Sequence, residues 1–384
     1  MEVLVLNEGK RQNSQHVEKR CAVSPGAAKR MVKKGISLHI ERGAGLLSGY
    51  SNGDYIDAGA TMIDEPAAAL PEIDMLLCVN RPFPEHVAKM KAGAIVVGHI
   101  DPFFQQAAVE RLANQQLTTL SVEMIPRSSR AQKMDALSSQ ASLAGYVMML
   151  QAANHLPAIL PMMMTPSGTI KPAKVFVIGA GVAGLQAIAT AKRLGASVLA
   201  YDTRAVVAEQ VESLGGKFLK IDIGETGQTK DGYAQALTEE QKAKQQDAQR
   251  DAIAAADIVI TTAQLFGRRP PLLISKETLS LMKPGSVVVD MAALSGGNVE
   301  GSIAGEITHV HGVTVIGTGN WSQQVAKDAT DMYANNLLNL IQEFYDEGTQ
   351  SFNVNLDDDI LAHSVITHNG SIINEMLKNA YSGA

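Results

Sequence analysis

Hydrophobic residues along the 384-residue chain form short continuous runs, separated by longer stretches with helical periodicity. Runs of four to six largely apolar residues bounded by glycine, proline or charge are typical of parallel strands buried on both faces. Their alternation with helical stretches predicts an α/β fold. In the first third of the chain we expect strands at 2–6, 36–40, 75–79, 94–97 and 117–122.

Helix boundaries in this first third follow from capping residues. Ser24 and Pro25 predict a helix start, because serine caps an N-terminus and proline fits the first turn, and Gly35 predicts the end. Further helices are expected at 84–91 and 102–114.

The rest of the chain repeats the pattern with strands expected at 175–178, 197–201, 218–221, 258–262, 287–291 and 313–316. Helices are expected at 185–194, before Leu214, and from a capping box at Thr238 to about Ala255. Two long helical runs with few breakers, 136–155 and 328–344, are expected to join two domains. The predicted fold class is α/β, with two Rossmann-like doubly wound domains joined by two long helices. Residues 1–135 with 330–384 would form one domain, and residues 136–329 the other.

A glycine-rich turn follows the strand at 175–178. Gly179, Gly181 and Gly184 have G-x-G-x-x-G spacing, which gives a tight turn, close approach of the backbone to a pyrophosphate, and close packing of helix on strand. The helix that follows offers free N–H groups to phosphates, with Val182 in its first turn. The order of strand, turn, helix and strand predicts a dinucleotide site, against a Rossmann domain that has lost its nucleotide.

Asp202 ends the second strand of this unit, eighteen residues after Gly184. A carboxylate there can accept hydrogen bonds from both ribose hydroxyls and repel a 2′-phosphate, which favours NAD over NADP. Arg204 lies close enough to restore NADP binding, so both nucleotides stay open from this stretch alone.

Other polar residues follow the predicted strands. Thr262, Ala263 and Gln264 lie at a strand end, where open α/β sheets bind ligands. Gly232 and Tyr233 lie in a polar, glycine-punctuated segment that we expect to be mobile. A hairpin at 161–172 carries three consecutive methionines, which would bury against a second subunit or cover this subunit's own core.

The most unusual stretch lies between a first-domain strand and the helix at 136–155, and is expected to face the interdomain cleft. Its polar side chains could grip a nicotinamide ribose and carboxamide, or form an interdomain hydrogen-bond network. The residues are Arg127, Ser128, Ser129, Arg130, Gln132, Asp135 and Ser138.

Several function classes are disfavoured. The net charge is −6 without a basic cluster, which argues against nucleic-acid binding, and the nine histidines show no metal-ligand spacing. Cys21 and Cys78 have no partner motif. The most apolar long window, 144–164, contains polar residues and two prolines, so we expect no membrane span and a cytoplasmic chain. His99, after a strand, is either an acid/base group or a packed histidine.

Taken together, the motifs resemble the NAD(H)-binding subunit, domain I of alpha type, of proton-translocating nicotinamide nucleotide transhydrogenases. The resemblance covers almost the whole chain and is most specific in the stretch from Arg127 to Ser139. The other matching stretches are 171–174, 232–234, 283–287, 296–298 and 335–339.

The resemblance implies roles for individual residues. Asp202, Thr203 and Arg204 would hold the adenosine ribose, and the glycines with Val182 the pyrophosphate. The stretch from Arg127 to Ser138 would surround the nicotinamide, with Gln132 bringing the partner's NADP within reach. Tyr233 would lie on a loop closing over NAD(H). Further cofactor contacts would come from Gln245, Thr262, Ala263 and Gln264.

The implied reaction is direct, Si/Re-specific hydride transfer from NADH to NADP⁺ on a partner domain. The implied partners are an NADP(H)-binding transhydrogenase domain, membrane-spanning subunits and a second copy of this chain. They would place the chain in the cytoplasm, peripheral to the inner membrane.

Alanine dehydrogenases are the competing resemblance. Arg20 matches their substrate-carboxylate arginine and His99 their catalytic histidine, but Asn80 stands where they carry a substrate lysine. Without that lysine, amino-acid chemistry is disfavoured. The chain also departs from its transhydrogenase relatives at 264–267 and at Asn320 and Trp321, which leaves the lining of the adenine pocket and cleft open.

Overall fold

The computed structural model describes residues 1–10, 17–221 and 238–382. The described chain forms two compact units, one of Met1–Gln140 with Gln323–Ala384 and one of Ala141–Ser322. We call them unit 1 and unit 2. The chain leaves unit 1 within α6 (Ala136–His155) and returns within η7 (Trp321–Val325), directly before α11 (Ala326–Phe344).

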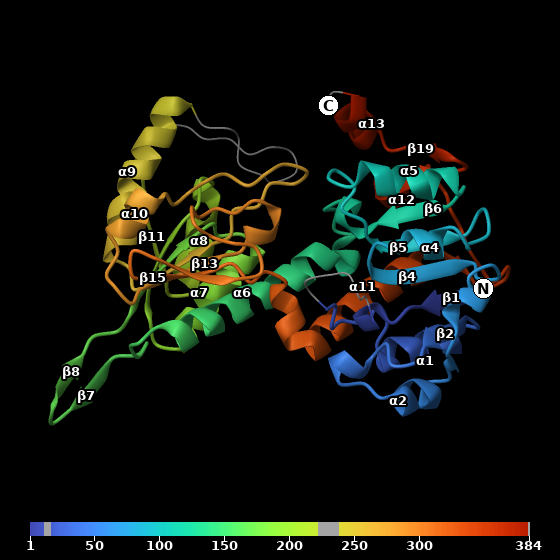
Figure 1. Ribbon diagram of the computed structural model, residues 1–384, viewed down its shortest axis with the longest axis horizontal. Helices are drawn as coiled ribbons and strands as arrows, with labels where there is room; N and C mark the ends of the chain where they lie inside the picture. The colour runs from blue at the N-terminus through green and yellow to red at the C-terminus, as the bar shows by residue number, and fades with distance from the viewer. Residues whose placement is uncertain (11–16, 222–237, 383–384) are drawn as a thin grey trace. The chain divides into compact units, whose positions relative to one another are not determined.

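Unit 1 contains an eight-stranded sheet in the order β19-β18-β6-β5-β4-β1-β2-β3 (Figure 1). All neighbouring strands are parallel except at β18 and β19. The strands are β1 Glu2–Val5, β2 Ser37–Glu41, β3 Thr61–Ile63, β4 Met75–Asn80, β5 Ile95–His99, β6 Thr118–Ser121, β18 Val365–His368 and β19 Ser371–Ile372.

The core of unit 1 forms where α1 (Pro25–Lys33) and α11 pack together on the sheet. Buried residues of both helices, such as Met31 and Leu337, join one hydrophobic cluster with strand residues such as Val5. The other helices of the unit are α2 Asn52–Asp57, α3 Pro66–Ala69, α4 Pro84–Val87, α5 Gln106–Asn114, α12 Asp359–Ser364 and α13 Glu375–Ser382.

Unit 2 contains a seven-stranded sheet in the order β11-β10-β9-β12-β13-β15-β14. Only β14 is antiparallel to its neighbour. The strands are β9 Lys174–Ile178, β10 Ser197–Tyr201, β11 Lys217–Phe218, β12 Ile258–Thr261, β13 Val287–Asp290, β14 Ile307–Val310 and β15 Val313–Ile316. The helices besides α6 are α7 Val182–Arg193, α8 Ala208–Ser213, α9 Glu239–Ala255 and α10 Lys276–Ser280.

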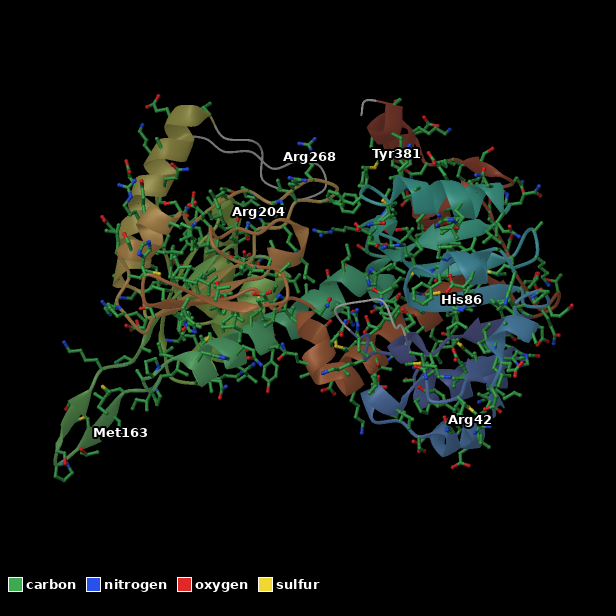
Figure 2. The ribbon with its side chains drawn as sticks, in the orientation of Figure 1. Arg42, His86, Met163, Arg204, Arg268 and Tyr381 are labelled. Atoms are coloured by element: carbon green, nitrogen blue, oxygen red, sulfur yellow. The ribbon has the colours of Figure 1, made fainter. Side chains whose placement is uncertain are left out.

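A two-stranded hairpin of β7 (Met163–Thr165) and β8 (Gly168–Ile170) extends away from the sheet of unit 2, with Met163 near its middle (Figures 1 and 2). Every residue of both strands is exposed, including Met164 at 73%. The hairpin therefore does not cover the core of its own unit, as one of the two sequence interpretations required.

The predicted fold class is confirmed, while several element boundaries are wrong. The helix expected at 102–114 begins at Gln106, because Asp101 has a positive φ and starts a turn to Phe104. The helix expected at 84–91 ends at Val87, and the strand expected at 218–221 is Lys217–Phe218 on the sheet edge. The helix expected from residue 185 begins at Val182, because the glycine at 184 is accommodated inside its first turn.

Candidate functional site

The glycine turn between β9 and α7 lies where unit 2 changes the direction of its strand order. The chain runs from β9 to β10 and β11 on one side, then returns to β12 on the other side of β9. Such a switch point, at the carboxyl ends of parallel strands, is the usual ligand position in open α/β sheets. The turn and the end of β12 meet there, since the Thr262 hydroxyl donates to the Gly179 carbonyl at 3.0 Å.

Two of the three glycines are required by packing. Gly179 has a φ of +99°, and a Cβ on it would lie 2.4 Å from Thr262 Oγ1. A Cβ on Gly184 would lie 1.9 Å from the Gly179 carbonyl oxygen. These distances allow no side chain, so α7 can approach β9 closely only with glycine at both positions.

Gly181 is different, because its face is open. It is the N-cap of α7 with an ordinary φ of −78°, and no side chain caps the helix. The nearest atom to a Cβ at Gly181 is Arg204 Nη2 at 3.9 Å. The open face, the uncapped helix N-terminus and the adjacent guanidinium suit an anionic group such as a pyrophosphate.

Asp202 follows β10 and is held on all sides. Its Oδ1 accepts from Arg204 N at 2.8 Å and Nε at 2.9 Å, and its Oδ2 accepts from Ala180 N at 2.8 Å and Arg204 Nη2 at 3.0 Å. A carboxylate has about four acceptor positions, so Arg204 occupies most of those that a ribose would use. This ion pair beside the glycine turn lies in unit 2 (Figure 2).

The carboxyl ends of β12 and β13 are joined by Asn298, which the sequence indicated only as a member of a longer motif. Its Nδ2 donates to the carbonyl oxygens of Ala263 at 3.0 Å and Pro271 at 2.8 Å. The fully buried Asp290 accepts from the backbone N–H groups of Ala292, Asn298 and Val299. Asp290 was missed, and the glycine pair before Asn298 is the only sequence signal for this loop.

The remaining unit 2 candidates are less defined. Thr203 is half-buried beside Asp202, and Gln264 is exposed after β12. Gly232 and Tyr233 lie outside the described residues, as does the side chain of Gln245. Trp321, one of the departures from the relatives, is buried and its indole N–H lies 3.4 Å from the Met291 carbonyl oxygen.

In unit 1 the 127–138 segment joins β6 to α6. Arg127, Ser129 and Gln132 are exposed, and Ser128 is half-buried. Arg130 pairs with Asp358, and Asp135 accepts from both the backbone N–H and the hydroxyl of Ser138. Asp135 thus caps the start of α6, which accounts structurally for two of the seven candidates.

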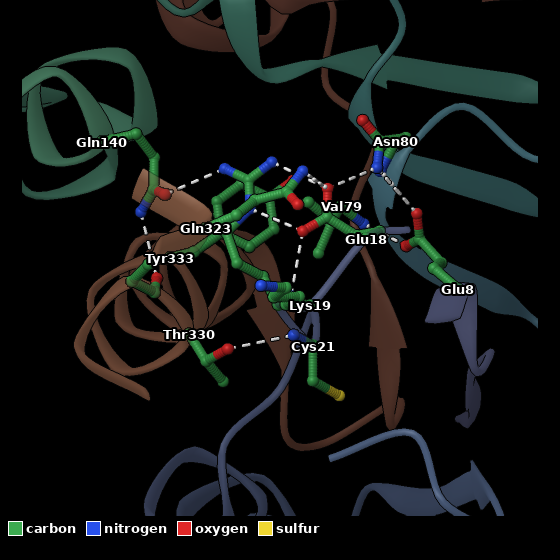
Figure 3. A network of polar contacts seen from close by, with 12 residues as sticks. Glu8, Glu18, Lys19, Cys21, Val79, Asn80, Gln140, Gln323, Thr330 and Tyr333 are labelled. Atoms are coloured by element: carbon green, nitrogen blue, oxygen red, sulfur yellow. Dashed lines mark hydrogen bonds and ion pairs between the residues drawn. The ribbon is translucent and has the colours of Figure 1, made fainter. Parts of the chain in front are cut away.

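A second polar cluster lies at the carboxyl edge of the unit 1 sheet (Figure 3). Arg20 donates to Glu18 through Nε and Nη2, both at 2.9 Å, and to Gln140 through Nη1 at 2.9 Å. Glu18 also accepts from Asn80 and Gln323. Burial would raise the pKa of Glu18, but the contacts with Arg20 and Asn80 outweigh it and lower the pKa.

Asn80 therefore belongs to a closed carboxylate network. Besides Glu18, its side chain donates to Glu8 at 3.1 Å, and its backbone N–H donates to Glu8 at 2.9 Å. The Arg20 fork is engaged by a carboxylate of this same chain, so both positions that resemble an amino-acid site serve internal contacts.

His99 is packed rather than isolated. Its ring stacks on Tyr333 with centroids 5.4 Å apart, and its Nδ1 lies 3.6 Å from Glu123 Oε1. Burial would raise the pKa of Glu123, but contacts with His99, Ser121 and the Asp101 backbone lower it to about 2.

Two further searches cover only the described residues of the chain. Over residues 1–10, 17–221 and 238–382, no group of three or more His, Cys, Asp or Glu side chains could hold a metal ion. In the same ranges, no helix is both long and apolar enough to cross a bilayer.

Comparison with known proteins places these features in a family. The N-terminal domain pattern of alanine dehydrogenase/PNT matches residues 5–144, and the C-terminal domain pattern matches residues 148–375. In Rhodospirillum rubrum the NAD(P) transhydrogenase subunit alpha is divided, and its first portion is 41% identical to this chain over 367 residues, covering 94% of this chain and 96% of that protein.

A solved transhydrogenase structure from Sinorhizobium meliloti is 40% identical, with a TM-score of 0.86, and covers 97% of this chain and 100% of that one. The alanine dehydrogenase of Mycolicibacterium smegmatis is 26% identical over 367 residues, covering 93% of this chain and 92% of that protein. The chain belongs to the alanine dehydrogenase/PNT family. Within it, the chain is similar over nearly its full length to the transhydrogenase subunits and more distant from this alanine dehydrogenase, which confirms the family resemblance found in the sequence.

Proposed function

We propose that this chain is the NAD(H)-binding component of a proton-translocating NAD(P) transhydrogenase. NADH, once bound, supplies a hydride that passes directly to NADP⁺ held on a partner domain. The observation that carries the proposal is the similarity to transhydrogenase subunits across both units. The glycine turn alone would not carry it, because many dinucleotide-binding families share that turn.

Unit 2 would bind the adenosine half of NAD(H). The open face of Gly181, with Gly179, Val182 and Gly184 around it, would receive the pyrophosphate at the N-terminus of α7. Asp202 and Thr203 would accept or donate hydrogen bonds to the ribose after Arg204 moves off the carboxylate. Gly232, Tyr233, Gln245, Thr262, Ala263 and Gln264 complete the proposed set, and residues 136–329 would be the NAD(H)-binding domain.

The 127–138 segment of unit 1 would serve the nicotinamide end. Hydride transfer between two nicotinamides needs neither acid nor base, so the task of the protein is orientation and exclusion of water. Gln132, with an exposed side chain on a well-anchored turn, would orient the partner's ribose. Arg127, Ser128, Ser129, Arg130, Asp135 and Ser138 would contact NAD(H) or support that turn.

The same proposal includes the assembly. The exposed methionines of the β7–β8 hairpin would bury against a second copy of the chain, giving a homodimer. Membrane-spanning partner subunits would hold it at the cytoplasmic face of the inner membrane and couple hydride transfer to proton movement.

A single-turnover mixing experiment tests the reaction. The purified chain loaded with NADH is mixed with a recombinant NADP-binding transhydrogenase domain carrying a chromophoric NADP⁺ analogue, and absorbance is followed. A fast burst is expected. Binding of NADH without a burst would contradict the proposal, and NADH turnover with pyruvate and ammonium would instead favour an amino-acid dehydrogenase.

A further inference from the structure

Gln132 lies on a short turn that is fastened to α11. The turn is η4 (Gln132–Met134), closed by hydrogen bonds from Met134 N to the Ala131 carbonyl at 2.8 Å and from Asp135 N to the Gln132 carbonyl at 3.3 Å. Ala131 and Met134 are fully buried in the unit 1 core, while Gln132 is exposed. The turn therefore presents Gln132 to solvent from a packed base.

Two asparagines of α11 bind one carbonyl of this turn. The Lys133 carbonyl oxygen accepts from Asn336 Nδ2 and from Asn339 Nδ2, both at 3.0 Å. Residue 133 directly follows Gln132, so its peptide plane fixes the backbone from which the Gln132 side chain leaves. Side-chain amides rarely converge in this way on a single loop carbonyl without a positional reason.

Asn336 also reaches the far side of the segment. Its Oδ1 lies 2.7 Å from the Ser139 hydroxyl, in the first turn of α6. Because Asn336 is 8% exposed, it has little freedom to turn away. One side chain thus ties the turn that carries Gln132 to the start of α6.

We propose that Asn336 and Asn339 are positioning residues for hydride transfer, acting through Gln132. They hold the Lys133 carbonyl, and hence the turn, so that Gln132 meets the NADP ribose of the partner domain at reacting distance. The proposal rests on the proposed function. It explains why two asparagines of the 335–339 run, rather than apolar residues, face the segment from α11.

The test uses the full chain in the single-turnover assay. Asn336→Asp keeps the shape and the acceptor for Ser139 but loses the donor to Lys133, and Asn339→Asp loses the second donor at a half-buried site. We expect hydride transfer to slow about 10- to 100-fold for Asn336→Asp and about 3- to 10-fold for Asn339→Asp, because small misplacements cost this much. NADH affinity should stay within about twofold, since the adenosine site lies in unit 2.

Asn335→Asp is the matched control, because that asparagine lies in the same run and contacts Arg30 instead of Lys133. It should transfer hydride at the wild-type rate. Gln132→Asn completes a double-mutant cycle: if Asn336 acts through Gln132, then adding Asn336→Asp to Gln132→Asn slows transfer no further.

The outcomes separate the two claims. Wild-type rates in folded Asn336→Asp and Asn339→Asp would overturn the inference alone, as would an equal loss of rate and NADH affinity. If Asn336→Asp does not fold, the more accessible Asn339→Asp decides by the same criterion. No transfer by the wild-type chain would overturn the proposed function and the inference with it.

Discussion

The Asp202 carboxylate holds one edge of the Arg204 guanidinium, with Oδ1 at 2.9 Å from Nε and Oδ2 at 3.0 Å from Nη2. The pair lies beside the open face of Gly181, so a ribose at Asp202 must compete with Arg204. The same two side chains therefore decide both how NAD(H) enters and how a 2′-phosphate is treated.

Replacing Asp202 by alanine should reduce the preference for NADH over NADPH at least about tenfold. The ribose loses its acceptor, the repulsion of the 2′-phosphate disappears, and Arg204 becomes available to it. Dissociation constants for both nucleotides, from quenching of nucleotide fluorescence, measure the effect. The double variant with Arg204→Ala should lose the gain for NADPH. An unchanged preference in Asp202→Ala would show that the carboxylate does not select the nucleotide.

The three glycines should separate folding from binding. Gly184→Ala should destabilise unit 2 by about 1–3 kcal/mol or more, because its Cβ would lie 1.9 Å from a carbonyl oxygen. Gly181→Ala should melt like the wild-type chain, since no atom lies within 3.9 Å, yet bind NADH at least about tenfold more weakly. Thermal melting and NADH titration on both variants check this. Wild-type NADH affinity in Gly181→Ala would place the pyrophosphate elsewhere.

Glu123 should make unit 1 sensitive to acid. Its pKa falls from an ordinary 4.5 to about 2 in the folded chain, so its stabilisation is complete above pH 4.5 and is lost as the pH falls towards 2. The contribution is about 3 kcal/mol at neutral pH. Glu123→Gln should lower the melting temperature at pH 7 and flatten its fall between pH 4.5 and 2. The exposed Glu85→Gln is the control. Equal pH profiles for Glu123→Gln and the wild-type chain would contradict the contribution of this pair.

The hairpin should control the oligomeric state. Met162 and Met164 are 61% and 73% exposed, and introducing a charge at either should prevent their burial against a second copy. We expect a dimer for the wild-type chain and a monomer for Met164→Glu in sedimentation at micromolar concentration. Leu272→Glu, another exposed apolar position at 56%, should remain dimeric. A dimeric Met164→Glu would remove the hairpin from the interface.

The sequence predicted those elements whose signals are local. The helix at 136–155 has the bounds expected, because Asp135 caps its start and few breakers interrupt it. By contrast, β3, β14 and β18 were missed, since they lie at or near sheet edges and two of them run antiparallel to a neighbour. Short edge strands carry little periodicity, and their pairing depends on distant partners.

The candidate site divides in the same way. The three glycines and Asp202 follow from spacing within one βαβ unit. The Arg20 network needs contacts with Gln140 across 120 residues, and the anchoring of Lys133 needs Asn336 across 203 residues. No pattern in a single sequence reports such contacts. That Arg204 would occupy its neighbour Asp202 could not be foreseen either, because it depends on a rotamer.

The most direct test of the central claim follows the hydride itself. NADH carrying deuterium at one face of C4 is bound to this chain and mixed with the NADP-binding domain carrying an NADP⁺ analogue, and the reduced analogue is analysed by mass spectrometry. The account predicts that deuterium from one of the two labelled forms of NADH appears in the analogue, with none released to water. Loss of the label to solvent, or reduction of the analogue without it, would contradict direct transfer.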